Sequence, residues 1–235
     1  MRLKDSPAGF TLVELMASII ILTILAVLIL SGIKNVQSSA RSAACISNLR
    51  SLGVGFASYA SENDGLFPTS STGGPWPEKI AAYVPRKNFF CPEAVALEKT
   101  QSVVTSINTD KTWSDSMTRV SYGYNYRYLD PEFGSGWTIP RPREQITFLS
   151  LSRMGSVVVL ADAGRLNTEK TGGWGFYVME PPHLQYSMPL PRHSKHANVL
   201  WADGHVSQRK CILTPKNATE SYEYISQKEW DWRLQ

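Results

Sequence analysis

The chain has 235 residues, of which 43% are hydrophobic and 19% are charged, and its formal net charge is +4. This composition excludes a fully disordered chain, which has few apolar residues and a high net charge. The mild charge does not indicate a nucleic-acid partner, and three cysteines are too few for a small disulfide-stapled fold. The apolar residues are concentrated near the N-terminus, and this uneven distribution is the first informative feature.

Residues 10–33 form an apolar segment in which Glu14 is the single charged residue. As a helix, such a segment extends about 36 Å, enough to cross a hydrocarbon core of about 30 Å. The preceding residues 1–9 carry Arg2 and Lys4, and a short positive end stays in the cytoplasm. The sequence therefore predicts a single-pass membrane helix, with the chain after residue 34 exported.

A cleaved secretory signal peptide is the competing interpretation of this segment. Such a signal has an apolar core of about 7–15 residues followed by a small-residue cleavage site. The apolar run here is longer and contains an acid, and the weak site at residues 38–40 lies far from its beginning. We therefore favour the membrane helix.

Glu14 needs an explanation of its own, because a carboxylate at the centre of a membrane helix costs about 2.5–3.5 kcal/mol, and less near the end. If the chain began at Phe10, its α-amine would be a cation that could pair with Glu14 of a neighbouring subunit. The structural alternative is that Glu14 extends to the membrane surface, and the residue taken alone favours this alternative.

The heptapeptide Gly9–Leu15, with its basic leader and the apolar run that follows, resembles the class III signal of type IV pilins and type II secretion pseudopilins. In that family a membrane peptidase cuts after the glycine, and the new N-terminal residue, usually phenylalanine, is methylated. A glutamate at the fifth mature position neutralises the amine of an adjacent subunit. The resemblance implies cleavage after Gly9, N-methylation of Phe10 and an assembly role for Glu14.

The resemblance continues beyond the signal, strongly to residue 68 and in patches to about residue 210. His193, followed after nine residues by Asp203 and Gly204, resembles the processing-associated motif of pilin-like proteins of planctomycete and verrucomicrobial type, whose role is not established. Ser31 stands where many pilins have a proline, so the resemblance does not imply the kink common in their helix, although Ser31-Gly32 could still soften the helix here. The other similar segments are residues 45–53, 63–68, 90–92 and 121–125.

The resemblance implies an α+β, pilin-like fold, with a long N-terminal helix packed on a small antiparallel sheet. The residues agree: an apolar stripe continues the helix through residues 34–64, and Asn63-Asp64-Gly65 predicts its end. Gly53 and Gly55 would allow a sheet to approach closely. The stripe consists of Val36, Ala40, Ala43, Leu49, Leu52, Phe56 and Tyr59.

The exported head is expected to span residues 65–235, after a leader over 1–9, a membrane helix over 10–33 and its amphipathic continuation over 34–64. Asp203-Gly204 between two strand-like runs predicts a hairpin turn. The remaining expectations are a loop region over 65–118 with a short helix at 78–84, a central strand at 156–160, and further strands within 120–128, 174–179, 197–202 and 206–210.

No sequence motif of a nucleophile, zinc protease or phosphate loop is present, so the chain is not expected to be an enzyme. A metal site would need His193, His196 and His205 to converge, but a structural role for His193 beside the Asp203-Gly204 turn is favoured. Asp162 offers one carboxylate, so a calcium site is not indicated. No cofactor is expected.

Cys45, Cys91 and Cys211 lie on the expected exported side, where disulfides persist. We favour a Cys45–Cys91 bond, which would tie the loop to the helix and stabilise the fold by about 3–4 kcal/mol in the chain-entropy model. A Cys91–Cys211 bond and free thiols are the alternatives. Trp230 and Trp232 are expected to cover a sheet edge rather than to bind a partner.

These expectations describe a prepilin of the bacterial inner membrane, with a cytoplasmic N-terminus and a periplasmic head. Its partners would be other pilin-like subunits, the prepilin peptidase, the assembly platform and the membrane, and no nucleic acid. Two alternatives stay open: a membrane-tethered binding module and a metal-dependent periplasmic enzyme.

Overall fold

A computed structural model places the chain in two compact units, Met1–Ala40 and Arg41–Gln235. The first unit and the second meet within one continuous helix, α1, which spans Leu12–Glu62. The structure describes residues 10–70, 74–94, 120–131, 147–151, 153–166, 173–175, 177–179 and 187–210.

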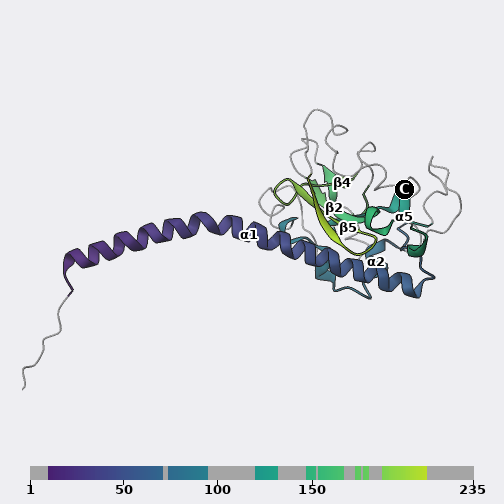
Figure 1. Cartoon of the computed structure of the whole chain (residues 1–235), viewed down its shortest axis with the longest axis horizontal. Helices are drawn as coiled ribbons and strands as arrows, with labels where there is room; N and C mark the ends of the chain where they lie inside the picture. Colours follow the sequence, from purple (N-terminus) through teal and green to yellow (C-terminus); the bar gives the residue numbers. More distant parts are fainter. Residues whose placement is uncertain are drawn as a thin grey trace, which may run out of the picture. The chain divides into compact units, whose positions relative to one another are not determined.

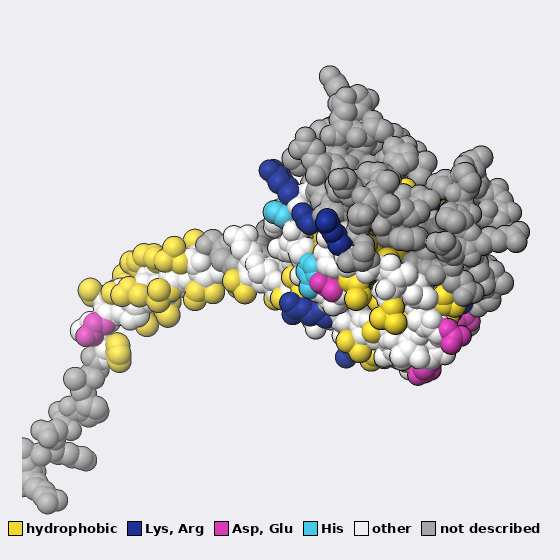
Figure 2. All heavy atoms as spheres, turned by 45° about the vertical axis from the view of Figure 1, so that its right-hand side comes forward, with side chains coloured by type: hydrophobic (Ala, Val, Ile, Leu, Met, Phe, Trp, Pro, Cys, Tyr) yellow, Lys and Arg dark blue, Asp and Glu magenta, His cyan; other side chains and the backbone are white. Residues whose placement is uncertain are grey.

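The predicted long helix is confirmed by α1 (Figure 1). Its helical assignment is unbroken through Ser31 and Gly32, where the proline common in pilins is missing. Side chains 10–30 are all exposed within the monomer, and hydrophobic groups cover the visible face of this part of the helix (Figure 2). A helix this apolar is stable only in lipid or against other apolar surfaces.

The end of α1 follows the prediction from Asn63-Asp64-Gly65. Asp64 and Gly65 adopt positive φ angles of 52° and 78°, and the Gly65 N–H donates to the Ala60 carbonyl at 2.8 Å. A left-handed residue after the last turn satisfies carbonyls that the helix leaves without partners, and glycine adopts it at little cost. The chain then reverses into the head.

The buried stripe of α1 starts later than predicted. Val36, Ala40 and Ala43 are exposed, because the contacts of the helix with the head core begin at Cys45, two residues past Ala43. From there the spacing of three and four residues buries one face, as expected for an amphipathic helix. The buried residues are Cys45, Leu49, Leu52, Phe56 and Ala60.

The short helix after the first loop, α2, spans Trp76–Ile80 rather than the predicted 78–84. It begins earlier because a proline is tolerated in the first turn of a helix, where its missing N–H has no partner to lose, and Pro77 occupies such a position. A 3-10 helix, η1, follows at Arg86–Phe89. Both elements lie within the region expected to be loop.

The head contains an antiparallel sheet in the order β1-β2-β5-β6, which confirms the α+β arrangement. The central strand β2 pairs on its two sides with β1 and β5, and β3 and β4 pair with its C-terminal part. The strands are β1 Tyr122–Tyr124, β2 Val158–Leu166, β3 Gly173–Gly175, β4 Met188–Pro189, β5 His196–Trp201 and β6 Val206–Lys210.

Several predicted strands have different bounds, and β3 spans Gly173–Gly175 where a strand within 174–179 was predicted. β1 is shorter than the predicted 120–128, because the strand ends at Asn125. The backbone N–H of Asn125 donates to the Val159 carbonyl, and its side-chain amide donates to the Val158 carbonyl. A short helix, α5, then spans Tyr126–Leu129. β2 is central as predicted but longer, because β3 and β4 supply partners for its second half. Two further 3-10 helices are η2, Phe148–Ser150, and η3, Met154–Ser156.

The core of the head is formed by buried side chains from the second part of α1, from the sheet, and from α2 and η1. Phe56 of α1 packs its ring 5.4 Å from those of Trp76 and Tyr124. As predicted, Gly53 faces the sheet, where an added Cβ would lie 3.0 Å from Leu200. Gly55 instead faces the α2 region.

We predict that Gly55→Ala destabilises the head. The added Cβ would lie 2.3 Å from Val84 Cγ2 and 2.8 Å from Ile80 Cγ2. An overpacked side chain lowers the free energy of unfolding by about 1–3 kcal/mol. The higher helix propensity of alanine raises it by at most about 1 kcal/mol. Urea unfolding followed by tryptophan fluorescence measures the loss. Val54→Ala is the matched control, because Val54 is 67% exposed, and equal stability of the two variants would contradict the close contact.

Candidate functional sites

The first candidate site is the N-terminal end of α1, where Thr11 and Glu14 form a capping box. The Glu14 carboxylate accepts hydrogen bonds from the Thr11 N–H at 2.9 Å and from the Thr11 hydroxyl at 2.8 Å. The Glu14 N–H in turn donates to the Thr11 hydroxyl oxygen at 3.3 Å. This reciprocal arrangement satisfies donors that a helix start leaves without partners.

The capping box positions a carboxylate in the first turn of an apolar helix. A negative charge there interacts favourably with the positive end of the helix dipole, so Glu14 is held where a cation could approach it. Thr11 was not among the residues predicted to form this site. The signal was present, since a threonine three residues before a glutamate, at the start of an apolar run, is typical of a capping box.

The two processing residues lie at the edge of what the structure describes. Gly9, the residue of the predicted cut, lies outside the described residues. Phe10 precedes α1 and is exposed. The placement of Phe10 next to the capping box puts the predicted new N-terminus four residues from Glu14 in the sequence.

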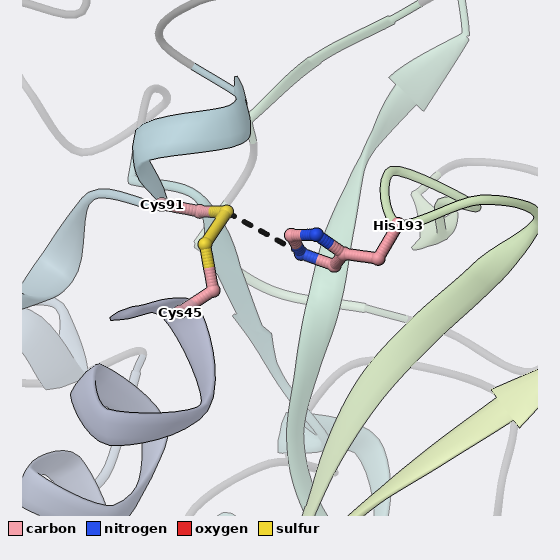
Figure 3. A group of neighbouring side chains, drawn as sticks. All are labelled: Cys45, Cys91 and His193. Atoms are coloured by element: carbon pink, nitrogen blue, oxygen red, sulfur yellow. Dashed lines mark hydrogen bonds between the residues drawn. A yellow bond between two sulfur atoms is a disulfide. The ribbon is translucent and has the colours of Figure 1, made fainter. Parts of the chain in front are cut away.

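The second candidate site is a buried cluster around Cys45 and Cys91, which are joined by a disulfide (Figure 3). This is the pairing that the sequence analysis favoured, and Cys211 of the alternative pair lies outside the described residues. Cys45 belongs to α1, and Cys91 follows η1. The bond therefore links the helix covalently to the first loop of the head.

His193 points its imidazole at this disulfide (Figure 3). Its Nε2 atom lies 3.5 Å from the Cys91 sulfur and 3.1 Å from Oδ2 of Asp162 on β2. Asp162 Oδ2 also accepts the N–H of Asn198 on β5, at 2.7 Å. All of these groups are buried. Asp162 therefore ties His193 to the two central strands.

Arg192 supplies positive charge to the same buried region. Its guanidinium donates to the carbonyls of Ser121, at 2.6 Å, and Ala163, at 3.0 Å. These residues border the β1–β2 pairing that contains Asp162. A buried arginine bound to carbonyls and a buried carboxylate nearby offset each other's charge, which lowers the cost of burying either one.

Tyr122 of β1 is buried in the same region as Asp162 and Arg192. Its hydroxyl donates to the Cys45 carbonyl at 3.3 Å. Burial raises the pKa of Tyr122 well above its ordinary value, and the Asp162 carboxylate raises it further, while a hydrogen bond with Asn48 and the charge of Arg192 oppose the rise. The phenol therefore stays neutral in the folded head.

The structure explains the spacing between His193 and Asp203-Gly204, because these residues stand at opposite ends of β5. At one end His193 and His196 exchange two backbone hydrogen bonds across a tight turn, in which Ser194 and Lys195 have positive φ angles. At the other end Gly204 turns the chain into β6 with a φ of 87°. His193 therefore lies just before β5, and Asp203-Gly204 lies just after it.

The turn at Asp203-Gly204 is the predicted hairpin, of a three-residue type. The Gly204 N–H donates to the Trp201 carbonyl at 2.9 Å, and the Trp201 N–H donates to the His205 carbonyl at 3.0 Å. This pattern is a type I turn followed by a left-handed residue. Asp203 Oδ1 lies 2.6 Å from the ring Nδ1 of His205. The same oxygen accepts a hydrogen bond from the backbone N–H of His205 at 3.0 Å.

The three histidines considered as metal ligands do not converge, which contradicts the requirement of the metalloenzyme alternative. His193 is buried in the cluster, and His205 is exposed at the other end of β5. A six-residue strand separates the ends by about 20 Å, because the hairpin that joins β5 to β6 turns at the end away from His193. His196 instead places Nδ1 2.9 Å from the Ser194 carbonyl.

Sequence reasoning missed or left aside two features, one in the cluster and one at the other end of β5. Asp162 was weighed only as a lone carboxylate, because its contact with His193 depends on the register of β2 and β5, which no local pattern specifies. A half-open apolar pocket of about 280 Å³ lies between α1 and the Asp203-Gly204 turn, at the lower edge of ligand-pocket sizes. Trp230 and Trp232 lie outside the described residues.

We predict that Tyr122→Phe flattens the alkaline pH dependence of head stability. The unfolded tyrosine loses its proton near pH 10, whereas the folded one holds it because its pKa is raised. Above pH 10 the wild-type head therefore loses about 1.4 kcal/mol per pH unit relative to the variant. Below pH 10 the variant is less stable by about 1 kcal/mol, since it lacks one hydrogen bond.

Urea unfolding of the full chain in detergent, repeated from about pH 9 to pH 11, measures both effects. Parallel curves for the wild type and Tyr122→Phe would mean that the phenol ionises as readily in the folded head as in the unfolded chain.

Comparison with known proteins gives one family match. Residues 6–30 match the family model described as "Prokaryotic N-terminal methylation motif". No curated protein and no solved structure shows significant similarity to the chain. The match contains Gly9, Phe10, Thr11 and Glu14, and it covers the first part of a helix that is long and apolar enough to cross a membrane. The N-terminal region of this chain is therefore similar to a prepilin signal, which fits a single-pass membrane protein.

Proposed function

We propose that this protein is a prepilin, a structural subunit of a type II secretion pseudopilus or of a type IV pilus-like filament. The observation that carries the proposal is the methylation motif at residues 6–30, placed at the start of a long apolar helix with Glu14 in its first turn. The proposed work is assembly rather than catalysis.

The apolar part of α1 supports a passage from lipid into a filament. Within the monomer its side chains from 10 to 30 are exposed, so lipid or neighbouring helices must cover them. When the helix leaves lipid and packs against other helices of the same kind, its side chains move from one apolar environment to another. The free-energy difference between the two states is therefore small, and a single interaction can decide whether the subunits assemble. The unmatched Glu14 charge supplies such a difference, because pairing it with a cation removes a costly charge from lipid.

The proposed cation is the α-amine of Phe10 in the adjacent subunit, exposed once a prepilin peptidase has cut after Gly9. The Thr11 capping box holds the Glu14 carboxylate until then. N-methylation of Phe10 retains the positive charge of the amine. Repetition of one such contact from subunit to subunit gives an open helical filament, as in any heterologous interface that does not close.

The proposed location is the bacterial inner membrane, with residues 1–9 in the cytoplasm and the head in the periplasm. Arg2 and Lys4 support this orientation, and the Cys45–Cys91 disulfide supports an oxidising compartment for the head. The proposed partners are further subunits of this kind, the peptidase and an assembly platform in the membrane. A tethered binding module would share the export signal but not the filament.

We predict that Gly9→Val leaves the leader attached. In the family that the signal resembles, the leader ends in glycine and is cut after it, and a branched side chain at that position would be too large for a site that accepts glycine. Intact mass and N-terminal sequence of protein from native membranes measure the outcome. The wild type should begin at N-methyl-Phe10, and Ala8→Val, one residue earlier, serves as the matched control. Normal processing of Gly9→Val would overturn the peptidase assignment.

We predict that Glu14→Ala is processed normally but is not incorporated into filaments, because its helix cannot pair with the amine of the next subunit. Sheared-filament fractions and the N-terminal mass of the same cells separate the two steps. Ser18→Ala, one helical turn away, is the control and should assemble. Assembly of Glu14→Ala at the wild-type level would rule out the proposed contact and leave the tethered binding module as the better explanation.

A further inference from the structure

We propose that the buried cluster of Cys45, Cys91, His193 and Asp162 is a second kind of site, which binds one zinc-type metal ion when its disulfide is reduced. This inference concerns the head and is independent of filament assembly. It assigns to His193 a chemistry that the turn does not require, since the backbone of His193 makes the turn, whereas its ring contacts Asp162 and the Cys91 sulfur.

The side chains present the ligand set of a structural zinc site. Zinc prefers four ligands drawn from thiolate sulfur, imidazole nitrogen and carboxylate oxygen, in a tetrahedron. One ligand atom from each of Cys45, Cys91 and His193 lies within 4.8 Å of the other two. The carboxylate of Asp162 lies 3.1 Å from Nε2 but outside this group of three, so it would supply the fourth ligand by turning toward the cysteines.

The distances already approach those between zinc ligands. With zinc–sulfur bonds of about 2.3 Å and zinc–nitrogen bonds of about 2.0 Å, tetrahedral ligands lie about 3.4–3.8 Å apart. His193 Nε2 lies 3.5 Å from the Cys91 sulfur and 3.1 Å from Asp162 Oδ2. Nε2 is thus the ring atom aimed at both neighbours. Once the disulfide opens, the two cysteine sulfurs must rotate apart to the separation of zinc ligands to admit the ion.

The charge balance of the buried region is the same in both forms. In the oxidised form the disulfide is neutral, and the Asp162 carboxylate is offset by the Arg192 guanidinium. In the metal form two thiolates offset one divalent cation, and Asp162 and Arg192 keep their charges. Burial of the metal therefore adds no net charge to the core, which avoids the main cost of burying ions.

The exchange between the two forms balances as follows. A dithiol reductant transfers two electrons and two protons to the Cys45–Cys91 bond, giving two thiols, and is itself oxidised to a disulfide. The metal ion then displaces the two thiol protons and any proton on His193 Nε2. Either closure ties α1 to Cys91, two residues after the end of η1, so the head keeps a cross-link in both redox states.

The test uses the full chain in detergent with Cys211→Ser as the background, so that two cysteines remain. After anaerobic reduction with a phosphine, cobalt(II) is titrated as a spectroscopic probe. We expect the absorption of a tetrahedral thiolate-bound cobalt, saturating at a single equivalent and displaced by zinc. The oxidised chain should give no such spectrum. A reduced chain that binds no more cobalt than the oxidised chain overturns the proposal.

Variants locate the site. Cys45→Ser should abolish the thiolate spectrum, and His193→Gln should weaken cobalt binding by at least about 100-fold, since even outer partners of a metal ligand contribute 10–100-fold. His205→Gln and His196→Gln are matched controls and should bind as the parent does. An unchanged affinity in His193→Gln, or a loss confined to His205→Gln, would contradict the assignment.

A second measurement needs no variant in the cluster and so does not depend on its folding. Alkylation of the reduced wild-type chain is followed by mass spectrometry for each cysteine, with and without zinc. Zinc should slow the alkylation of Cys45 and Cys91 at least about tenfold, since a metal-bound thiolate is removed from the free pool, while Cys211 serves as the internal control. Equal rates at Cys45 and Cys91 with and without zinc would overturn the proposal.

Discussion

The fold depends on one helix that must satisfy two surroundings. The first part of α1 exposes apolar side chains all round, whereas from Cys45 onward one face is buried and the other is exposed. No proline or helix end marks the change, so the identity of the side chains alone separates the two regimes. The head core begins where the first buried cysteine appears, and the sheet is arranged around that stretch of helix.

Within the head, a few buried polar groups determine the register in which the apolar strands pair. Asp162 accepts from the backbone of β5 and contacts His193, and Arg192 reaches the carbonyls that border β1. Apolar packing would tolerate a shift of a strand by two residues, but such a shift would leave these buried groups without partners, at a high cost. The cluster thus fixes the register of β1, β2 and β5.

Local patterns in the sequence predicted much of this fold. The apolar run, the Asn63-Asp64-Gly65 stop and the Asp203-Gly204 hairpin depend on nearby residues, and each was found where predicted. The start of the buried stripe and the extent of β2 were wrong, because distant partners determine them. The approach of Asp162 to His193 was missed for the same reason. At the N-terminus the Thr11 cap was readable from spacing and was overlooked.

The Cys45–Cys91 bond also determines how the head carries tension. The two cysteines are 46 residues apart in sequence. A pull on the N-terminal end of α1 reaches Cys45 and passes through the covalent bond to Cys91, bypassing the last turns of the helix, the reversal at Gly65 and α2. The bypassed segment cannot be extended by the pull while the bond between Cys45 and Cys91 is intact. Mechanical resistance of the head is thereby shifted to the sheet, where β1, β2 and β5 are held together by hydrogen bonds.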